Sequence, residues 1–174
     1  QVRGERVTTA SLEALAKYVR GIRALDLEAQ PSKGAALLEE AIALDSTFAM
    51  AYRRLSVELD VREGQQQRVR DLIQHAYEHR HRLTDPERYL VEAGYYSYGP
   101  VADEAKAIAS YEAALQAEPR LGAALNNRAI LLMRRHEFAR AESSFNKFIA
   151  LDRTATQGYN NLVLVDVTLG KLDA

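Results

Sequence analysis

The stretch LGAALNNRAILLMRRHEFARAESSFNKFIALDRTA, residues 121–155, contains a pattern that returns elsewhere in the chain. Its opening, LGAALNN, corresponds to TQGYNNL at residues 156–162, and FIALDRTATQGY at 148–159 corresponds to AIALDSTFAMAY at 41–52. An internal repeat of a few tens of residues indicates an array of similar units, each packed on its neighbours, rather than one irregular core.

The period of this repeat is about 34 residues, the length of two helices and two short turns. Comparable positions in the second helix of successive repeats are Ala41, Ala76, Ala114 and Phe148, which are separated by 35, 38 and 34 residues. The apolar spacing is helical, as in Leu12, Leu15, Val19 and Ile22, and no segment alternates with the period of a strand. The sequence therefore predicts nine helices and no β-sheet.

Proline and glycine residues mark the predicted boundaries of these helices. All four prolines lie between helices or at their first turn, where the missing N–H costs least. Thr84 and Glu87 have the spacing of a capping box at the start of a helix. Turns between paired helices are predicted at Gln30–Pro31, Glu63–Gly64, Gly99–Pro100 and Arg135–Glu137.

The residues of the repeat resemble those of the tetratricopeptide repeat (TPR) family over about residues 9–174. Within 121–155, the positions that carry the resemblance are Leu125, Arg128, Ala129, Leu132, Ala141, Phe145 and Phe148. The resemblance implies an all-α fold, a right-handed superhelical solenoid of antiparallel helix pairs whose first helices line a concave face. About four and a half repeats are expected, at 9–48, 49–83, 84–121, 122–155 and an incomplete 156–174, with residues 1–8 as a linker from an upstream domain.

The third of these repeats is expected to depart most from the others. Its anchor separation of 38 residues is the longest of the three, and Gly99-Pro100 is expected to break its first helix early.

Composition and motifs argue against several classes of function. A net charge of −1 does not suit generic nucleic-acid binding, which needs a basic surface. Without cysteine the chain has neither disulfides nor a thiolate metal site, and no run of 18 apolar residues predicts a membrane span. Nucleophile-elbow, zinc-protease, phosphate-loop and dinucleotide-binding motifs are all missing, so we predict no enzyme activity and no cofactor.

Two clusters have alternative interpretations that the sequence leaves open. His75 and His79 are spaced four residues apart with His81 close by, which suits zinc, but the sequence places no further ligand to complete such a site and a solvated helix face is the more common explanation. A tyrosine-rich segment from Tyr89 to Tyr98 is either a stacking wall for a ligand or part of the helix core.

The TPR resemblance implies a peptide-binding site on the concave face. In TPR proteins that hold extended peptides, an Asn in the middle of the first helix binds the ligand main chain, and Asn127 and Asn161 match that position. The other residues expected on this face are Arg53, Arg54, Val57, Asn126, Ile130, Met133, Arg134, Asn160 and Leu164. The arginines predict an acidic peptide, but the full set of residues that clamps acidic C-termini in chaperone-binding TPR proteins is missing.

A second resemblance concerns the parent protein. VTTASLEALAKYVRGIRAL at 7–25 and HRLTDPERYLVEAGYY at 81–96 resemble the TPR region that follows the kinase domain of bacterial receptor-type serine/threonine kinases, and similar segments occur in bacterial winged-helix regulators. This implies the sensor or scaffold arm of a longer signalling protein. The alternative is a self-assembly module that stacks through its terminal helices.

Overall fold

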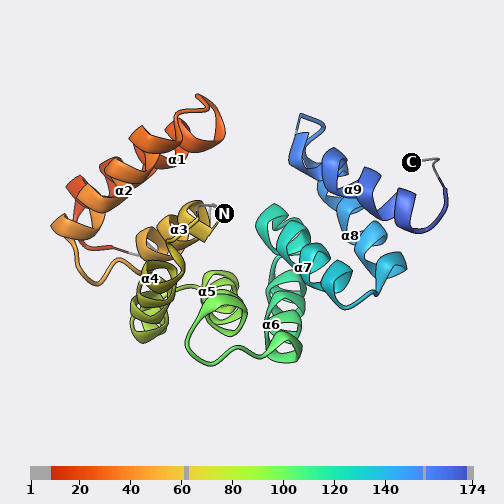
Figure 1. Ribbon diagram of the computed structural model, residues 1–174. Coiled ribbons are helices and arrows are strands. Elements are labelled where there is room, and N and C mark those ends of the chain that lie inside the picture. Colours follow the sequence, from red (N-terminus) through yellow and green to blue (C-terminus); the bar gives the residue numbers. More distant parts are fainter. Residues whose placement is uncertain (1–8, 61–62, 155, 172–174) are drawn as a thin grey trace, which may run out of the picture. The chain divides into compact units, whose positions relative to one another are not determined.

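The computed structural model describes residues 9–60, 63–154 and 156–171, which form two compact units, Gln1–Ala102 and Asp103–Ala174 (Figure 1). Unit 1 contains α1 (Leu12–Asp26), α2 (Pro31–Leu44), α3 (Ala49–Asp60), α4 (Gln66–Glu78), a short 3-10 helix η1 (Arg80–Arg82) and α5 (Asp85–Tyr98). Unit 2 contains α6 (Glu104–Ala117), α7 (Gly122–Arg134), α8 (Phe138–Leu151) and α9 (Thr156–Thr168). The described residues thus form nine α-helices and no strand, as predicted, whereas the predicted linker 1–8 lies outside them.

Helices that follow one another in sequence pack together within each unit. In unit 1, α1 packs on α2, α2 on α3, α3 on α4 and α4 on α5, and in unit 2 the same order runs from α6 to α9. The most extensive contacts join sequence neighbours, and helices two apart also meet, as α3 meets α5 and α7 meets α9. This is the packing of a helical solenoid. None of the helices in the described part of the chain is long and apolar enough to span a membrane.

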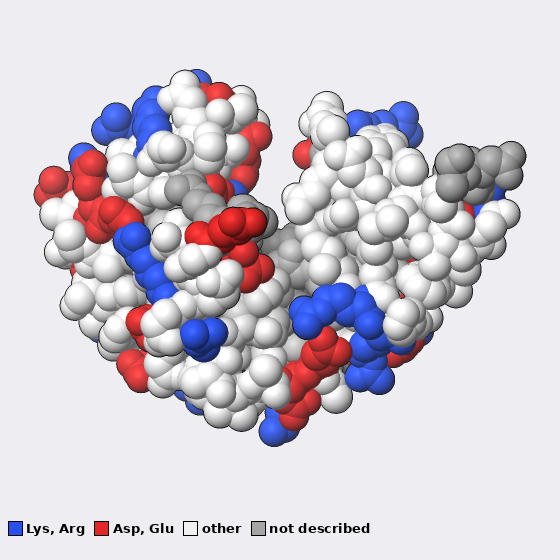
Figure 2. All heavy atoms as spheres, viewed as in Figure 1, with Lys and Arg blue, Asp and Glu red and all other residues white. Residues whose placement is uncertain are grey.

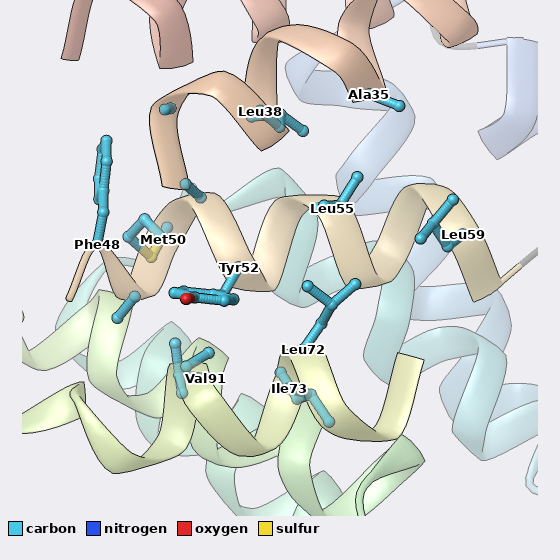
Figure 3. Packing of buried hydrophobic residues seen from close by; sticks show 14 of the residues in the cluster. Ala35, Leu38, Phe48, Met50, Tyr52, Leu55, Leu59, Leu72, Ile73 and Val91 are labelled. Atoms are coloured by element: carbon cyan, nitrogen blue, oxygen red, sulfur yellow. The ribbon is translucent and has the colours of Figure 1, made fainter. Parts of the chain in front are cut away.

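The core of unit 1 is built around α3. Figure 3 shows Tyr52 and Leu55 of α3 between Leu38 of α2 on one side and Ile73 of α4 on the other. Just before α3, the ring of Phe48 is fully buried and lies 4.9 Å from the ring of Tyr18 in α1. Helix α3 is covered by α2 on one side and by α4 on the other. A single helix pair of this unit would therefore expose much of its buried apolar surface if its neighbours were removed.

Small residues set the closest helix approaches. A Cβ atom at Gly34 would lie 3.1 Å from the backbone oxygen of Gly21 and would also collide with Leu25, so α1 and α2 can cross this closely only with glycine there. In unit 2, Ala129 of α7 and Ala141 of α8 are fully buried, as predicted. Gly158 plays the corresponding part where α9 crosses α8.

Several predicted boundaries are confirmed. The backbone N–H of Thr84 donates a hydrogen bond to Glu87 Oε2 at 3.0 Å at the start of α5. The turns after α3 and α9 contain Gly64 and Gly170 with φ of 76° and 68°, a backbone region open to glycine.

The third repeat differs from what the sequence predicted. Gly99-Pro100 does not shorten its first helix, because α5 has 14 residues and α7 has 13. The reason is that the peptide N–H of Gly99 still bonds to the carbonyl of Tyr95, and the chain leaves the helix only after that bond. The boundary between the two units then falls between α5 and α6, so the helix pair predicted for residues 84–121 is not contained in either unit.

Candidate functional site

The residues predicted to bind a peptide belong to two separate sets, one in each unit. Arg53, Arg54 and Val57 lie on α3 of unit 1. The rest lie on the first helices of the two repeats in unit 2, namely Asn126, Asn127, Ile130, Met133 and Arg134 on α7 and Asn160, Asn161 and Leu164 on α9. Within unit 2, α7 and α9 are in contact with each other.

The two arginines of unit 1 are less available than the sequence suggested. Arg53 is only 6% exposed, and Arg54 Nη2 forms an ion pair with Asp26 Oδ1 of α1 at 2.6 Å. Tyr18 lies close to this pair. Burial raises the pKa of its phenol, and the charges of Arg53 and Arg54 act in the opposite direction.

On α7, Asn126 and Asn127 are joined through their side chains. The Nδ2 group of Asn126 donates to Oδ1 of Asn127 at 3.1 Å. Asn126 is buried, and its own Oδ1 accepts no hydrogen bond from any described residue. A buried amide oxygen without a donor is costly, so this acceptor calls for a partner.

On α9, Asn160 is exposed and Asn161 is half-buried. The Nδ2 group of Asn161 is buried and has no acceptor within the described part of the chain. Leu164, about one helical turn beyond Asn160 and Asn161, is 55% exposed. Helices α7 and α9 therefore each carry a buried amide atom without a partner among the described residues, and Leu164 adds an exposed apolar side chain.

The charges expected to attract an acidic ligand are largely compensated. Arg134 Nη2 lies 2.9 Å from Glu104 Oε1 of α6, just as Arg54 is paired with Asp26. Figure 2 shows the same pattern more widely, with acidic and basic side chains interspersed on the viewed face. Acids of the chain itself thus pair with Arg54 and Arg134, which weakens the positive field expected from Arg53, Arg54 and Arg134.

One polar cluster was not predicted as such. Arg128 stands where the equivalent residues of α3 and α9 are Leu55 and Leu162, and it contacts residues of both α6 and α8. Its Nη2 is 3.3 Å from Glu112 Oε1, while its Nη1 donates to Ser144 Oγ at 3.3 Å. Arg140 Nη2 binds the same Glu112 oxygen at 2.9 Å. The only sequence signal was a charged residue at an apolar position, and it did not reveal the partners.

The alternative clusters are resolved in part. Among the described residues no group of three His, Cys, Asp or Glu is placed to hold a metal, and His75 lies 3.6 Å from Glu78. Tyr95 stacks on Tyr77 with ring centres 4.0 Å apart, and both Tyr95 and Tyr98 pack against the core of unit 1. For these two tyrosines the interpretation as core residues is confirmed.

Comparisons with known proteins extend the description of the fold. No family model matches the chain, and neither does any curated protein. Among solved structures, MamA from Desulfovibrio magneticus RS-1 is 15% identical, with 93% of this chain and 88% of that chain covered and a TM-score of 0.50. YrrB, described as a TPR protein with an unusual peptide-binding site, is 14% identical, with 92% and 79% covered and a TM-score of 0.47.

A tetratricopeptide repeat protein from Parabacteroides merdae ATCC 43184 is also similar, at 15% identity, with 92% of this chain and 62% of that chain covered and a TM-score of 0.49. At such identities the likeness concerns the fold alone. The fold is an all-α array of packed helices, and two of the three similar structures are described as tetratricopeptide repeat proteins.

Proposed function

We propose that this chain is a protein–protein interaction module that binds an extended peptide segment across α7 and α9 of unit 2. The observation that carries the proposal is the pair of unsatisfied amide atoms on neighbouring helices, Asn126 Oδ1 and Asn161 Nδ2. The fold supports the same class of function, since helical repeat arrays act through extended binding surfaces rather than through catalytic pockets.

The chemistry of the two amides fits a peptide main chain. A peptide main chain presents an N–H donor and a C=O acceptor at nearly every residue, and an amide side chain likewise carries both a donor and an acceptor. The Oδ1 atom of Asn127 already accepts a hydrogen bond from Asn126, which leaves its Nδ2 group as the part of the side chain that can donate to a ligand carbonyl. Asn127 is half-buried. Asn160, exposed on α9, extends the row of amides.

Apolar residues beside the amides supply contacts for ligand side chains. Ile130 and Met133 are half-buried on α7, and Leu164 is largely exposed on α9. Covering exposed apolar surface contributes roughly 25 cal/mol per Å² of area removed from water. We infer that the peptide carries at least one apolar side chain for this part of the face.

An acidic ligand would have to compete with acidic groups of the chain itself. Glu104 would have to release Arg134 before a ligand carboxylate took its place. The exchange replaces one partly exposed ion pair by another, which gains little net free energy. A preference for acidic peptides is therefore proposed to act mainly on the rate of association.

The test is a selection of random 12-residue peptides displayed on phage, followed by fluorescence-anisotropy titration of the selected peptides. Wild type is compared with the Asn127→Ala/Asn161→Ala double variant and with Asn146→Ala, a control in which an exposed Asn on α8 is removed. The proposal expects weaker binding only for the double variant. Equal affinities for all three proteins would refute binding on this face.

The resemblance of the opening segment supports a further part of the proposal, that the module belongs to a bacterial signalling protein such as a serine/threonine kinase. In that setting the module would serve as the sensor or scaffold arm. The reading frame upstream of Gln1 tests this part: a kinase or winged-helix domain there is the expected result, and an unrelated domain would contradict it.

A further inference from the structure

Arg128 of α7 is a charged residue at a position that is apolar in other repeats of the chain. The equivalent residues are Leu55 of α3, which is buried, and Leu162 of α9. Only 18% of the Arg128 side chain is exposed, so most of it is removed from water. A sheltered charge is costly unless hydrogen bonds and an opposite charge compensate it.

The contacts of Arg128 compensate its charge only in part. Its Nη2 atom lies 3.3 Å from Glu112 Oε1, and its Nη1 group donates to Ser144 Oγ at 3.3 Å. Both distances exceed the usual length of a charge-assisted hydrogen bond, about 2.7–2.9 Å. The Nε atom is buried and has no acceptor among the described residues. A guanidinium group has several N–H donors, so this one keeps the capacity to bind a further acceptor.

The charges around Arg128 form an alternating chain with an arginine at each end. Glu112 Oε1 also lies 2.9 Å from Arg140 Nη2, and Arg140 Nη1 binds Glu137. Glu137 Oε1 in turn lies 2.9 Å from Arg135 Nε. Three arginines thus share two carboxylates, which leaves one positive charge in excess. The Arg135 side chain is 42% exposed, so water screens that end, and the sheltered end at Arg128 gains most from a further negative charge.

A cavity beside Arg128 gives a ligand access to this end of the chain of charges. Its volume is about 280 Å³, and Arg128 lines it together with Glu112, Leu115 and Gln116 of α6. Gln116 is exposed and carries an amide donor, whereas Leu115 is half-buried and offers an apolar side chain. The cavity therefore combines a cation that lacks an acceptor with a second donor and an apolar surface, all within unit 2.

We propose that this cavity binds the carboxylate of a Glu or Asp side chain from a partner protein, as the counter-charge of Arg128. One excess positive charge calls for a monoanion such as a carboxylate, whereas a phosphoryl group carries close to two negative charges. The planar fork of a guanidinium group also matches the two oxygens of a carboxylate. When the ligand binds, it replaces Glu112 at Arg128, and Glu112 stays with Arg140. This site uses α6 and α7, whereas the proposed peptide site uses α7 and α9.

The test is an NMR titration of the ¹⁵N-labelled chain with two capped dipeptides, N-acetyl-leucyl-glutamate amide and N-acetyl-leucyl-glutamine amide. The probes differ only in the side-chain carboxylate, and both titrations are run at the same constant ionic strength. Arginine Nε–H resonances report directly on the guanidinium groups. We expect the Glu probe to shift the Arg128 Nε–H resonance and to bind about tenfold more tightly than the Gln probe, as one sheltered charge pair allows.

Two variants distinguish ligand binding from a purely structural role of these ion pairs. Arg128→Leu introduces the residue type of the equivalent positions, so it should keep or raise the melting temperature while losing the preference for the Glu probe. Glu112→Gln removes the carboxylate that competes with the ligand, so it should bind the Glu probe about fivefold more tightly than wild type does. Glu142→Gln, the same change at the α8 residue that pairs with Lys171, is the control and should leave the affinity unchanged.

Three results would overturn the proposal. The first is equal affinity of wild type for the two probes, or no binding of the Glu probe at millimolar concentration. The second is an unchanged affinity of Glu112→Gln, which would show that the ligand carboxylate does not replace Glu112. The third is tighter binding of a probe with phosphoserine in place of Glu, which would assign the cavity to a phosphoryl group.

Discussion

Arg54 of α3 and Asp26 of α1 are joined by an ion pair with 2.6 Å between Nη2 and Oδ1. The Arg54 side chain is 17% exposed and that of Asp26 is 52% exposed, so the pair is sheltered on one side only. A carboxylate from α1 thus compensates a charge on α3 that the sequence alone presented as available to a ligand.

The first prediction concerns the corresponding pair in unit 2, in which Arg134 Nη2 lies 2.9 Å from Glu104 Oε1. Glu104→Gln should leave the Arg134 charge of α7 uncompensated, so acidic peptides should associate faster with the peptide site of unit 2 and the rate should depend more steeply on salt. Stopped-flow fluorescence with an acidic and a neutral peptide of equal length measures the effect. Glu39→Gln removes the same charge from the Arg68 ion pair of α2 and α4 and serves as the control. If both variants speed association equally, net charge alone is responsible.

The second prediction concerns acid stability. Burial acts to raise the pKa of Asp45, but hydrogen bonds from Thr9 at 2.5 Å and from the hydroxyl of Thr47 at 2.7 Å hold that pKa below its ordinary value. A lowered pKa in the folded state stabilises the fold above the unfolded value of about 3.9, and this contribution is lost as pH falls through the folded value.

Asp45→Asn should therefore lower stability at neutral pH and flatten the loss of stability below about pH 4. Urea unfolding at several pH values from about 2 to about 7 measures both effects. Asp152 has the same turn with Thr154 but lacks a counterpart of Thr9, and it is exposed. Asp152→Asn should change the curve less, and an equal or larger change would contradict the role given to Thr9.

The third prediction concerns the core of unit 2. Phe145 of α8 is fully buried, so Phe145→Ala should cost about 3–5 kcal/mol through lost burial and a cavity. Ala141, fully buried where α8 meets α7, should tolerate a larger residue poorly, with a cost of about 1–3 kcal/mol for Ala141→Leu. Chemical denaturation measures both, and Ala139→Leu on the exposed side of α8 is the control. Wild-type stability for Phe145→Ala would show that the helix face is assigned wrongly.

The fourth prediction concerns the turn between α1 and α2. Ala29 has a φ of 51°, in the left-handed region that costs an L-residue roughly 1–2 kcal/mol. Ala29→Gly should therefore stabilise the protein by about 0.5–1 kcal/mol even after the greater chain entropy of glycine is counted. Ala36→Gly, at an exposed position inside α2, should instead destabilise by about 1 kcal/mol. Thermal melts that shift in the same direction for both variants would contradict the prediction.

Local signals predicted the helices and their boundaries. Pro31 and Pro86 lie in the first turn of α2 and α5, and Gly64 and Gly170 adopt positive φ, because these residue types restrict the backbone by themselves. The positive φ angles of Ala29 and His136 were not predicted, because alanine does not favour that conformation and a single histidine does not mark one.

The site was predicted less completely than the fold. Repeat alignment placed Asn127 and Asn161 on first helices, but it carried no information about which acid approaches which arginine. The partners of Arg54 and Arg134 are 28 and 30 residues away in sequence, and tertiary packing alone brings Asp26 and Glu104 to them. Arg128 shows the same limit, because its contacts with Glu112 and Ser144 depend on how α6 and α8 flank α7.

The most direct test of peptide binding by unit 2 is a double-mutant cycle on Asn127 and Asn161, in which affinity for one selected peptide and the thermal melt are measured on the same samples. A main-chain hydrogen bond contributes about 0.5–1.5 kcal/mol, so each Asn→Ala change should weaken binding about threefold to tenfold and the double change further. The melting temperature should stay within the error of wild type, because both side chains are proposed to serve the ligand. Unchanged affinity for the double variant, or a loss of affinity that tracks a lower melting temperature, would contradict binding through these two residues.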